Sequence, residues 1–129
     1  MKRILYLLLL PLAASVHGQS LAVVDDDFVE RVFHLNQMEY FIDTTNTLTI
    51  DVVSGQEYVN TFRRHDSYQN KDFVAGSSYW IRFPVKYDSD SEKSWVIEFY
   101  DQTIDRLDVF IPDDDGTFRP VTMGDHYEF

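Results

Sequence analysis

The feature that most constrains the fold is the alternating run over residues 79–87, Tyr-Trp-Ile-Arg-Phe-Pro-Val-Lys-Tyr. Successive side chains of a β-strand point to opposite faces, so this period of two predicts one long strand. The face expected to pack on a core carries Tyr79, Ile81, Phe83, Val85 and Tyr87. The opposite face carries Trp80, Arg82 and Lys86. A tryptophan beside an arginine on that face indicates either a binding surface or a face covered by a second layer.

Further alternating segments follow at residues 95–100, 106–111 and, more weakly, 118–123. Short polar turns separate them, including an Asp-Asp-Asp-Gly turn at 113–116. We therefore expect 79–87, 95–100 and 106–111 to be adjacent strands of an antiparallel meander. The side chains expected to be buried are Ile81, Phe83, Val85, Ile97, Phe99, Leu107, Val109 and Ile111.

The chain before this run is less regular. Strand-like segments lie near 21–24, 29–35 and 38–43, and the last ends in an Asp-Thr-Thr-Asn-Thr turn. Residues 48–55 fit a strand or a short helix that begins at Thr49 and stops at Gly55, and we favour the helix. A solvated loop or an irregular edge is the simplest interpretation of 56–72, and we favour it over a catalytic pair of His65 and Asp66. With no long helix predicted, the pattern indicates an all-β antiparallel sandwich.

The first 18 residues have the features of a secretory signal peptide. A basic start, Met-Lys-Arg, precedes an apolar run over residues 4–14 and a compact segment that ends at Gly18. That run is shorter than the roughly 18 residues needed to span a bilayer. We divide the chain into this signal peptide (1–18), an N-terminal arm or first strand (19–31) and a main domain (32–129). We expect the mature protein to be exported.

Charge and cysteine content exclude several functions. The net charge is −11, and removal of Lys2 and Arg3 with the signal peptide makes it −13. Nucleic acids and anionic membrane surfaces would repel such a chain, so neither is an expected partner. The sequence has no cysteine, which excludes disulfides, thiol chemistry and cysteine metal sites.

Three segments carry a family resemblance. They are Tyr-Trp-Ile-Arg-Phe at 79–83, Trp-Val-Ile-Glu-Phe at 95–99, and residues 104–113 with Gly116. Together with the Thr-Met-Gly-Asp tail at 122–125, they resemble the second extracellular domain type of bacterial seven-transmembrane receptors with diverse intracellular signalling modules, 7TMR-DISMED2. The resemblance covers about 32–129. It implies a jelly-roll-like sandwich, similar to carbohydrate-binding modules, on the periplasmic or extracytoplasmic face of the inner membrane.

The resemblance also implies a role in a larger receptor. The domain would sense a ligand, with a small molecule or a glycan as its expected partner. Membrane contact would come only through a seven-helix region, and signalling through a cytoplasmic output, and both are absent from this chain. The family pattern continues beyond Gly124, so we expect the domain to be incomplete at its C-terminus.

The candidate ligand residues are Trp80, Arg82, Glu98, Tyr100 and Phe110. Pyranose rings stack on aromatic faces, and a guanidinium binds hydroxyl or carboxylate oxygens. The alternative is a packed face, with Trp80 under a covering loop and Arg82 paired with Glu98 across the hairpin. In that case the domain would be a structural or protein-interaction module without a small ligand.

A third function is calcium response through Asp113, Asp114 and Asp115, since carboxylate oxygens are the ligands that calcium prefers. The acidic run does not match the spacing of an EF-hand, so a solvated turn is the simpler interpretation. We expect no other cofactor. The sequence has none of the common catalytic motifs, so we predict that the domain is not an enzyme.

Overall fold

The computed structural model describes residues 22–90, 93–100 and 104–124. Its strands are β1 (Ala22–Val24), β2 (Glu39–Asp43), β3 (Arg63–Arg64), β4 (Ser78–Arg82), β5 (Val85–Tyr87), β6 (Leu107–Pro112) and β7 (Phe118–Met123). Its helices are α1 (Ile50–Val53) and three 3-10 turns, η1 (Leu35–Gln37), η2 (Gln56–Tyr58) and η3 (Asn70–Asp72). Strands predominate, which confirms the predicted all-β class. The predicted signal peptide lies outside the described residues.

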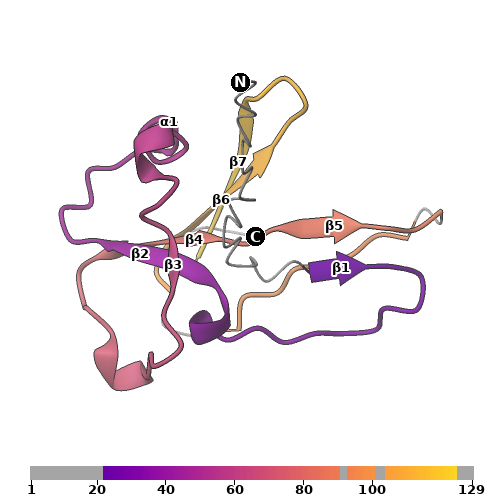
Figure 1. Ribbon diagram of the computed structural model, residues 1–129, viewed down its shortest axis with the longest axis horizontal. Helices are drawn as coiled ribbons and strands as arrows, with labels where there is room; N and C mark the ends of the chain where they lie inside the picture. Colours follow the sequence, from indigo (N-terminus) through magenta and orange to yellow (C-terminus); the bar gives the residue numbers. More distant parts are fainter. Residues whose placement is uncertain (1–21, 91–92, 101–103, 125–129) are drawn as a thin grey trace, which may run out of the picture.

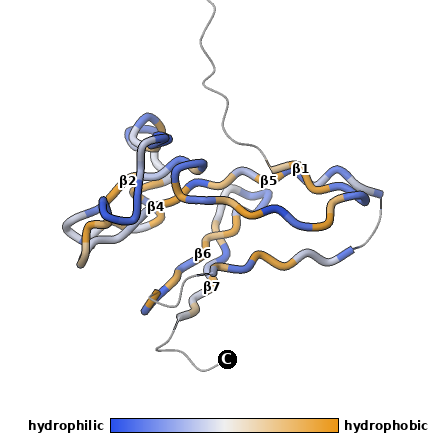
Figure 2. Tube along the Cα trace, turned by 90° about the horizontal axis from the view of Figure 1, so that it is seen from below, coloured by the Kyte–Doolittle hydropathy of each residue, from blue (hydrophilic) through white to orange (hydrophobic). Residues whose placement is uncertain are grey.

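The strands form three small sheets (Figure 1). An antiparallel three-stranded sheet has the order β3-β2-β4, and β6 and β7 form an antiparallel hairpin. The strands β1 and β5 pair in parallel, with Ala22 opposite Val85. Figure 2 shows the β6–β7 hairpin extending away from the layer that holds β2 and β4. Antiparallel pairing is thus confirmed for two of the three sheets, while the jelly-roll form stays a prediction.

Several local predictions are confirmed. The strands β2, β6 and β7 lie where alternation placed them, and the short helix α1 begins after Thr49. The turn after β2 forms around Asp43, whose carboxylate accepts hydrogen bonds from Thr45 and from the amides of Asn46 and Leu48. In the 113–116 turn, the Gly116 amide donates to the Asp113 carbonyl, and Gly116 adopts φ +84°.

The prediction of a single strand over 79–87 is wrong. The run divides into β4 and β5 on either side of Phe83 and Pro84, and the two halves belong to different sheets. Proline has no amide hydrogen and a fixed φ, so it interrupts a strand ladder. Its carbonyl is still used, because it accepts a hydrogen bond from the Ala22 amide (3.0 Å) next to the β1–β5 pair.

The predicted meander is also wrong. In the described range 93–100 the chain forms neither strand nor helix, and β4 pairs with β2 instead. Lys93 and Trp95 contact the N-terminal segment: Lys93 donates to the Asp26 carbonyl (2.8 Å), and Trp95 packs edge-on against Phe28 (5.1 Å). Residues 95–100 therefore form no strand despite their alternation, and no strand of the described residues pairs with them.

Burial departs from the prediction as a consequence. The predicted core residues Ile81, Val85, Ile97, Phe99 and Ile111 are exposed, Ile97 by as much as 64%. Phe83, Leu107 and Val109 are half-buried. The buried apolar side chains of the described residues are Ala22, Val24, Tyr40 and Val53. The core thus lies under β1, β2 and α1 rather than under a central meander.

Candidate functional site

The two faces of the β3-β2-β4 sheet have different roles. Side chains directly opposite each other in an antiparallel pair share a face, so the pairs Glu39 and Arg82 and Phe41 and Trp80 lie on one side. On this side Phe41 contacts the rings of Tyr58 (5.7 Å) and Phe62 (4.9 Å). This is the face that the sequence marks as either a binding surface or a covered layer, and the structure covers it.

Trp80 contributes to this covering. Its ring stacks on Phe110 of β6, with a centroid distance of 5.9 Å and an interplanar angle of 18°. The contact joins the β6–β7 hairpin to the sheet. The Trp80 indole nitrogen is buried, and no hydrogen-bond acceptor for it is found within the described part of the chain.

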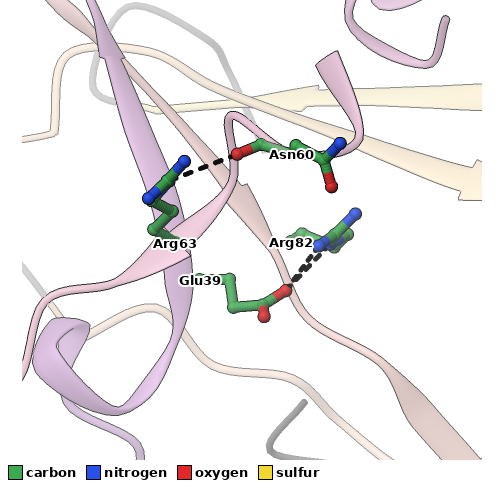
Figure 3. A network of polar contacts seen from close by, with 4 residues as sticks. All are labelled: Glu39, Asn60, Arg63 and Arg82. Carbon is green, nitrogen blue, oxygen red and sulfur yellow. Dashed lines mark hydrogen bonds and ion pairs between the residues drawn. The ribbon is translucent and has the colours of Figure 1, made fainter. Parts of the chain in front are cut away.

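Arg82 is paired with Glu39, and not with Glu98 as the packing interpretation of the sequence expects. Its Nη2 and Nε atoms donate to Glu39 Oε2 at 2.7 and 3.0 Å (Figure 3). Its guanidinium also lies over the Phe62 ring, 4.8 Å from the centroid. Because β2 rather than 95–100 is the neighbour of β4, the carboxylate comes from the opposite residue on β2.

The remaining predicted ligand residues lie outside this packed face. Glu98 and Tyr100 are exposed, Tyr100 by 92%. The structure therefore brings together Trp80, Phe110 and Arg82 as parts of a packed layer, and leaves Glu98 and Tyr100 open to solvent.

A pocket of about 460 Å³ adjoins β2 and the segment that follows η2. We call it the tyrosine pocket. Its lining residues are Tyr40, Phe41, Ile42, Thr61, Arg63, His65, Ser67, Tyr68 and Asp72. Its size falls within the range of small-molecule sites, roughly 300 to 1,000 Å³. The register places Tyr40 opposite Ile81 and Ile42 opposite Tyr79, so Tyr40 and Ile42 lie on the sheet face opposite Trp80, while Phe41, which also lines the pocket, lies on the Trp80 side.

Aromatic rings build one side of the pocket. The Tyr40 ring lies 4.5 Å from His65 and 5.8 Å from both Tyr68 and Tyr79, and it meets Tyr68 nearly at a right angle (81°). Tyr79 is held from behind by a stacked Phe73 (5.4 Å). Tyr40 is only 3% exposed, so its position is fixed by the core. We call the rings of Tyr40, His65 and Tyr68 the aromatic corner, in which Tyr40 is fixed by burial.

The tyrosine hydroxyls stay protonated at neutral pH. Burial raises the pKa of Tyr40 above its usual value near 10, and nearby Tyr79 and Asp72 raise it further. Burial likewise raises the pKa of Tyr68, with added effects from Tyr79, Tyr40 and Asp72. Tyr68, which is half-buried, can therefore present a neutral hydroxyl at the pocket, whereas Tyr40 is buried and contributes its ring.

The acidic turn has a local structural role. Asp115 Oδ1 accepts hydrogen bonds from the Thr117 amide (2.9 Å) and hydroxyl (2.6 Å), which lower the pKa of the carboxyl. Asp113 and Asp114 lie exposed in the same turn. Over the described ranges, no three acidic or histidine side chains gather in a way that could hold a metal ion.

Sequence reasoning missed the tyrosine pocket because its residues come from a segment with no regular pattern. The sequence favours a solvated loop or an irregular edge over 56–72, and this segment supplies the short edge strand β3 together with His65, Tyr68 and Asp72 of the pocket. The segment has four aromatic or imidazole side chains, Tyr58, Phe62, His65 and Tyr68. Two of them, His65 and Tyr68, line the pocket, while Tyr58 and Phe62 pack on Phe41, so composition alone does not mark the pocket residues.

An all-β domain with a pocket of this size is compatible with ligand sensing, and comparison with known families identifies the family. The family model 7TMR-DISMED2, described as 7TMR-DISM extracellular 2, matches residues 35–129. The chain therefore belongs to this family of extracellular receptor domains, which confirms the resemblance and places the domain outside the cytoplasm, in a sensor role. No curated protein and no solved structure matches the chain. Within the described residues, none of the helices is long and apolar enough to cross a bilayer.

Proposed function

We propose that this sensor domain binds a carbohydrate-like small ligand, without catalysis, and that the tyrosine pocket holds it. The observation that carries the proposal is the aromatic corner of Tyr40, His65 and Tyr68 around a cavity of about 460 Å³. Aromatic faces offer the apolar surface on which the C–H side of a sugar ring stacks.

Polar groups suitable for sugar hydroxyls line the same pocket. Thr61 and Ser67 supply hydroxyls, and Asp72 supplies a carboxylate. Together with the hydroxyl of Tyr68, they give the pocket both donors and acceptors beside its aromatic rings. A neutral or charged sugar of one or two rings would fit this chemistry.

The face predicted from sequence is the competing site. There Trp80 already stacks on Phe110, and Arg82 already pairs with Glu39. Trp80, Arg82 and Phe110 are half-buried, and a sugar that stacked on the Trp80 face held by Phe110 would have to displace that ring contact. We therefore assign Trp80, Arg82 and Phe110 to packing in this proposal.

Titration calorimetry against a panel of monosaccharides and disaccharides tests the proposal. Tyr68→Ala should weaken binding at least tenfold, because covering a large apolar side chain contributes roughly 1.5 to 3 kcal/mol. Tyr100→Ala is the matched control, since it removes an exposed tyrosine that the sequence predicts to bind ligand and that lies outside the tyrosine pocket. Loss of binding in Tyr100→Ala, with Tyr68→Ala unaffected, would overturn the assignment.

A protein-interaction module is the second candidate, and exposed apolar side chains favour it. Val85, Val96, Ile97 and Tyr100 are all exposed large hydrophobic residues. Exposed apolar groups often mark protein contacts. If the folded protein binds no sugar of the panel, this candidate replaces the first.

A further inference from the structure

Two opposite charges line the tyrosine pocket. Arg63 extends from β3, opposite Tyr40 in the register, and Asp72 ends η3. Asp72 lines the pocket together with Tyr40 and Tyr68, so its carboxylate shares the pocket with the aromatic corner. A ligand in the pocket would therefore meet a guanidinium and a carboxylate as well as the rings.

Neither charge is neutralised by another side chain of the described residues. Arg63 Nε donates to the main-chain oxygen of Asn60 at 3.3 Å (Figure 3), and Asp72 Oδ2 accepts from the Gln69 amide at 2.8 Å. No ion pair is found for either one in the ranges that the structure describes, although the adjacent Arg64 is paired with Asp66. The contrast within one short segment is informative, because Arg64 and Asp66 do not line the pocket.

We infer that the ligand of the tyrosine pocket carries both a negative group, bound by Arg63, and a positive group, bound by Asp72 and the aromatic corner. A guanidinium binds a carboxylate through a fork of donors. An ammonium group is attracted both by a carboxylate and by the faces of aromatic rings. This deepens the proposed function and rests on it: the sugar would be an amino sugar that also bears a carboxylate.

Arg63 and Asp72 are both exposed, so water solvates them in the free protein, and a ligand gains affinity from each charge only where it carries the opposite charge. The net charge of −11 favours the approach of cations over anions. Arg63 therefore has a specific role, because it supplies local positive charge where the rest of the chain would repel a carboxylate.

Four sugars that differ in charge test the inference by calorimetry at low salt. They are glucose (neutral), glucosamine (positive), glucuronate (negative) and muramic acid (both). We expect muramic acid to bind most tightly, with each matched charge adding about two- to fivefold, as for exposed ion pairs. Arg63→Gln should abolish the gain from the carboxylate, and Asp72→Asn the gain from the amine. Both variants keep a polar side chain of similar size, and the side-chain oxygen introduced by Asp72→Asn can still accept from the Gln69 amide.

Arg64→Gln and Asp66→Asn are the matched controls, and we expect both to retain the full preference for muramic acid. Equal affinity for all four sugars would overturn the inference and leave the proposed function standing.

Glycine betaine adds a zwitterion that is not a sugar. If betaine binds and no sugar does, the charge inference holds and the carbohydrate proposal fails. If the control variants lose the preference as fully as Arg63→Gln and Asp72→Asn do, the preference reflects overall charge, and the inference is wrong.

Discussion

At the scale of single residues, Asp43 shows how one carboxylate organises a loop. It is buried at the end of β2 and accepts hydrogen bonds from Thr45, Asn46 and Leu48. Asn46 continues the network, because its side-chain amide donates to the Gly76 carbonyl (2.7 Å). The turn after β2 is thereby linked to the segment that enters β4.

The first prediction concerns this carboxylate. The hydrogen bond from the Thr45 hydroxyl, with those from the backbone amides, lowers the pKa of Asp43. A lowered folded pKa means that its stabilisation is present above the unfolded value, about 3.9, and is lost as the pH falls through the folded value. Asp43→Asn should therefore lower the melting temperature at pH 7, and the difference from wild type should shrink in acid.

Asp114→Asn serves as the control for charge alone, since Asp114 is exposed in the 113–116 turn. It should melt close to wild type at every pH. A difference between wild type and Asp43→Asn that stays constant from pH 7 down to pH 2 would contradict the assigned role of the carboxylate.

The second prediction concerns Gly124. This residue has φ +132°, and a Cβ placed on it would lie 2.4 Å from the carbonyl oxygen of Asp105. Gly124→Ala should cost more than the roughly 1 to 3 kcal/mol expected for backbone strain alone. Gly116→Ala is the matched control, because Gly116 also has positive φ (+84°) but has no atom within 4 Å of the added Cβ. Urea unfolding curves should show a larger loss of unfolding free energy for Gly124→Ala than for Gly116→Ala. Equal losses in the two variants would contradict the close approach of Gly124 to Asp105.

Residue-level chemistry was partly predictable from the sequence. The turns at Asp43 and Gly116 follow from residue types that favour turns wherever they occur. The partner of Arg82 was not predictable in this way, because it depends on which strand lies beside β4. Glu39 and Glu98 are equally suitable carboxylates, and only the sheet order decides between them.

At the scale of secondary-structure elements, the contact of Trp80 with Phe110 joins the β6–β7 hairpin to the three-stranded sheet. The third prediction is that Phe110→Ala weakens this docking by about 1 to 3 kcal/mol while the hairpin itself persists. In a Trp95→Phe background, the fluorescence of Trp80 should shift to the red as its ring becomes hydrated.

Ile111→Ala is the control on the neighbouring residue, since Ile111 is exposed and points away from Phe110 along β6. It should leave the emission of Trp80 unchanged. An unshifted spectrum in Phe110→Ala would mean that the hairpin is held by other contacts.

Alternation located most of the strands but not their partners. Period two identifies a segment that can be a strand, whereas pairing depends on edges supplied from distant parts of the chain. Residues 95–100 alternate as well as β6 does, yet they join no strand edge among the described residues. Pro84 was the one local sign that the run over 79–87 would divide, because proline interrupts a strand ladder. The prediction gave more weight to the alternation on both sides of it.

At the scale of the whole molecule, each face of the β3-β2-β4 sheet departs from the predicted pattern in part. The face of Tyr79 and Ile81 is predicted to be core, and it holds the buried Tyr40, but Ile81 is 42% exposed and this face adjoins the tyrosine pocket. The face of Trp80 and Arg82 is predicted to be either a binding surface or a covered layer, and its contacts with Phe110 and Glu39 favour the covered layer. Hydrophobic pattern alone cannot distinguish an aromatic core face from an aromatic binding face, because both present the same side chains.

The most direct test of this account is a nuclear magnetic resonance titration of the protein with the sugar that binds most tightly. We expect shifts at the amides of His65, Tyr68 and Asp72, which line the proposed site, and an unmoved indole N–H signal of Trp80, which does not line it. Shifts concentrated at the Trp80 indole, Phe110 and Tyr100, with the signals of His65, Tyr68 and Asp72 unchanged, would contradict it.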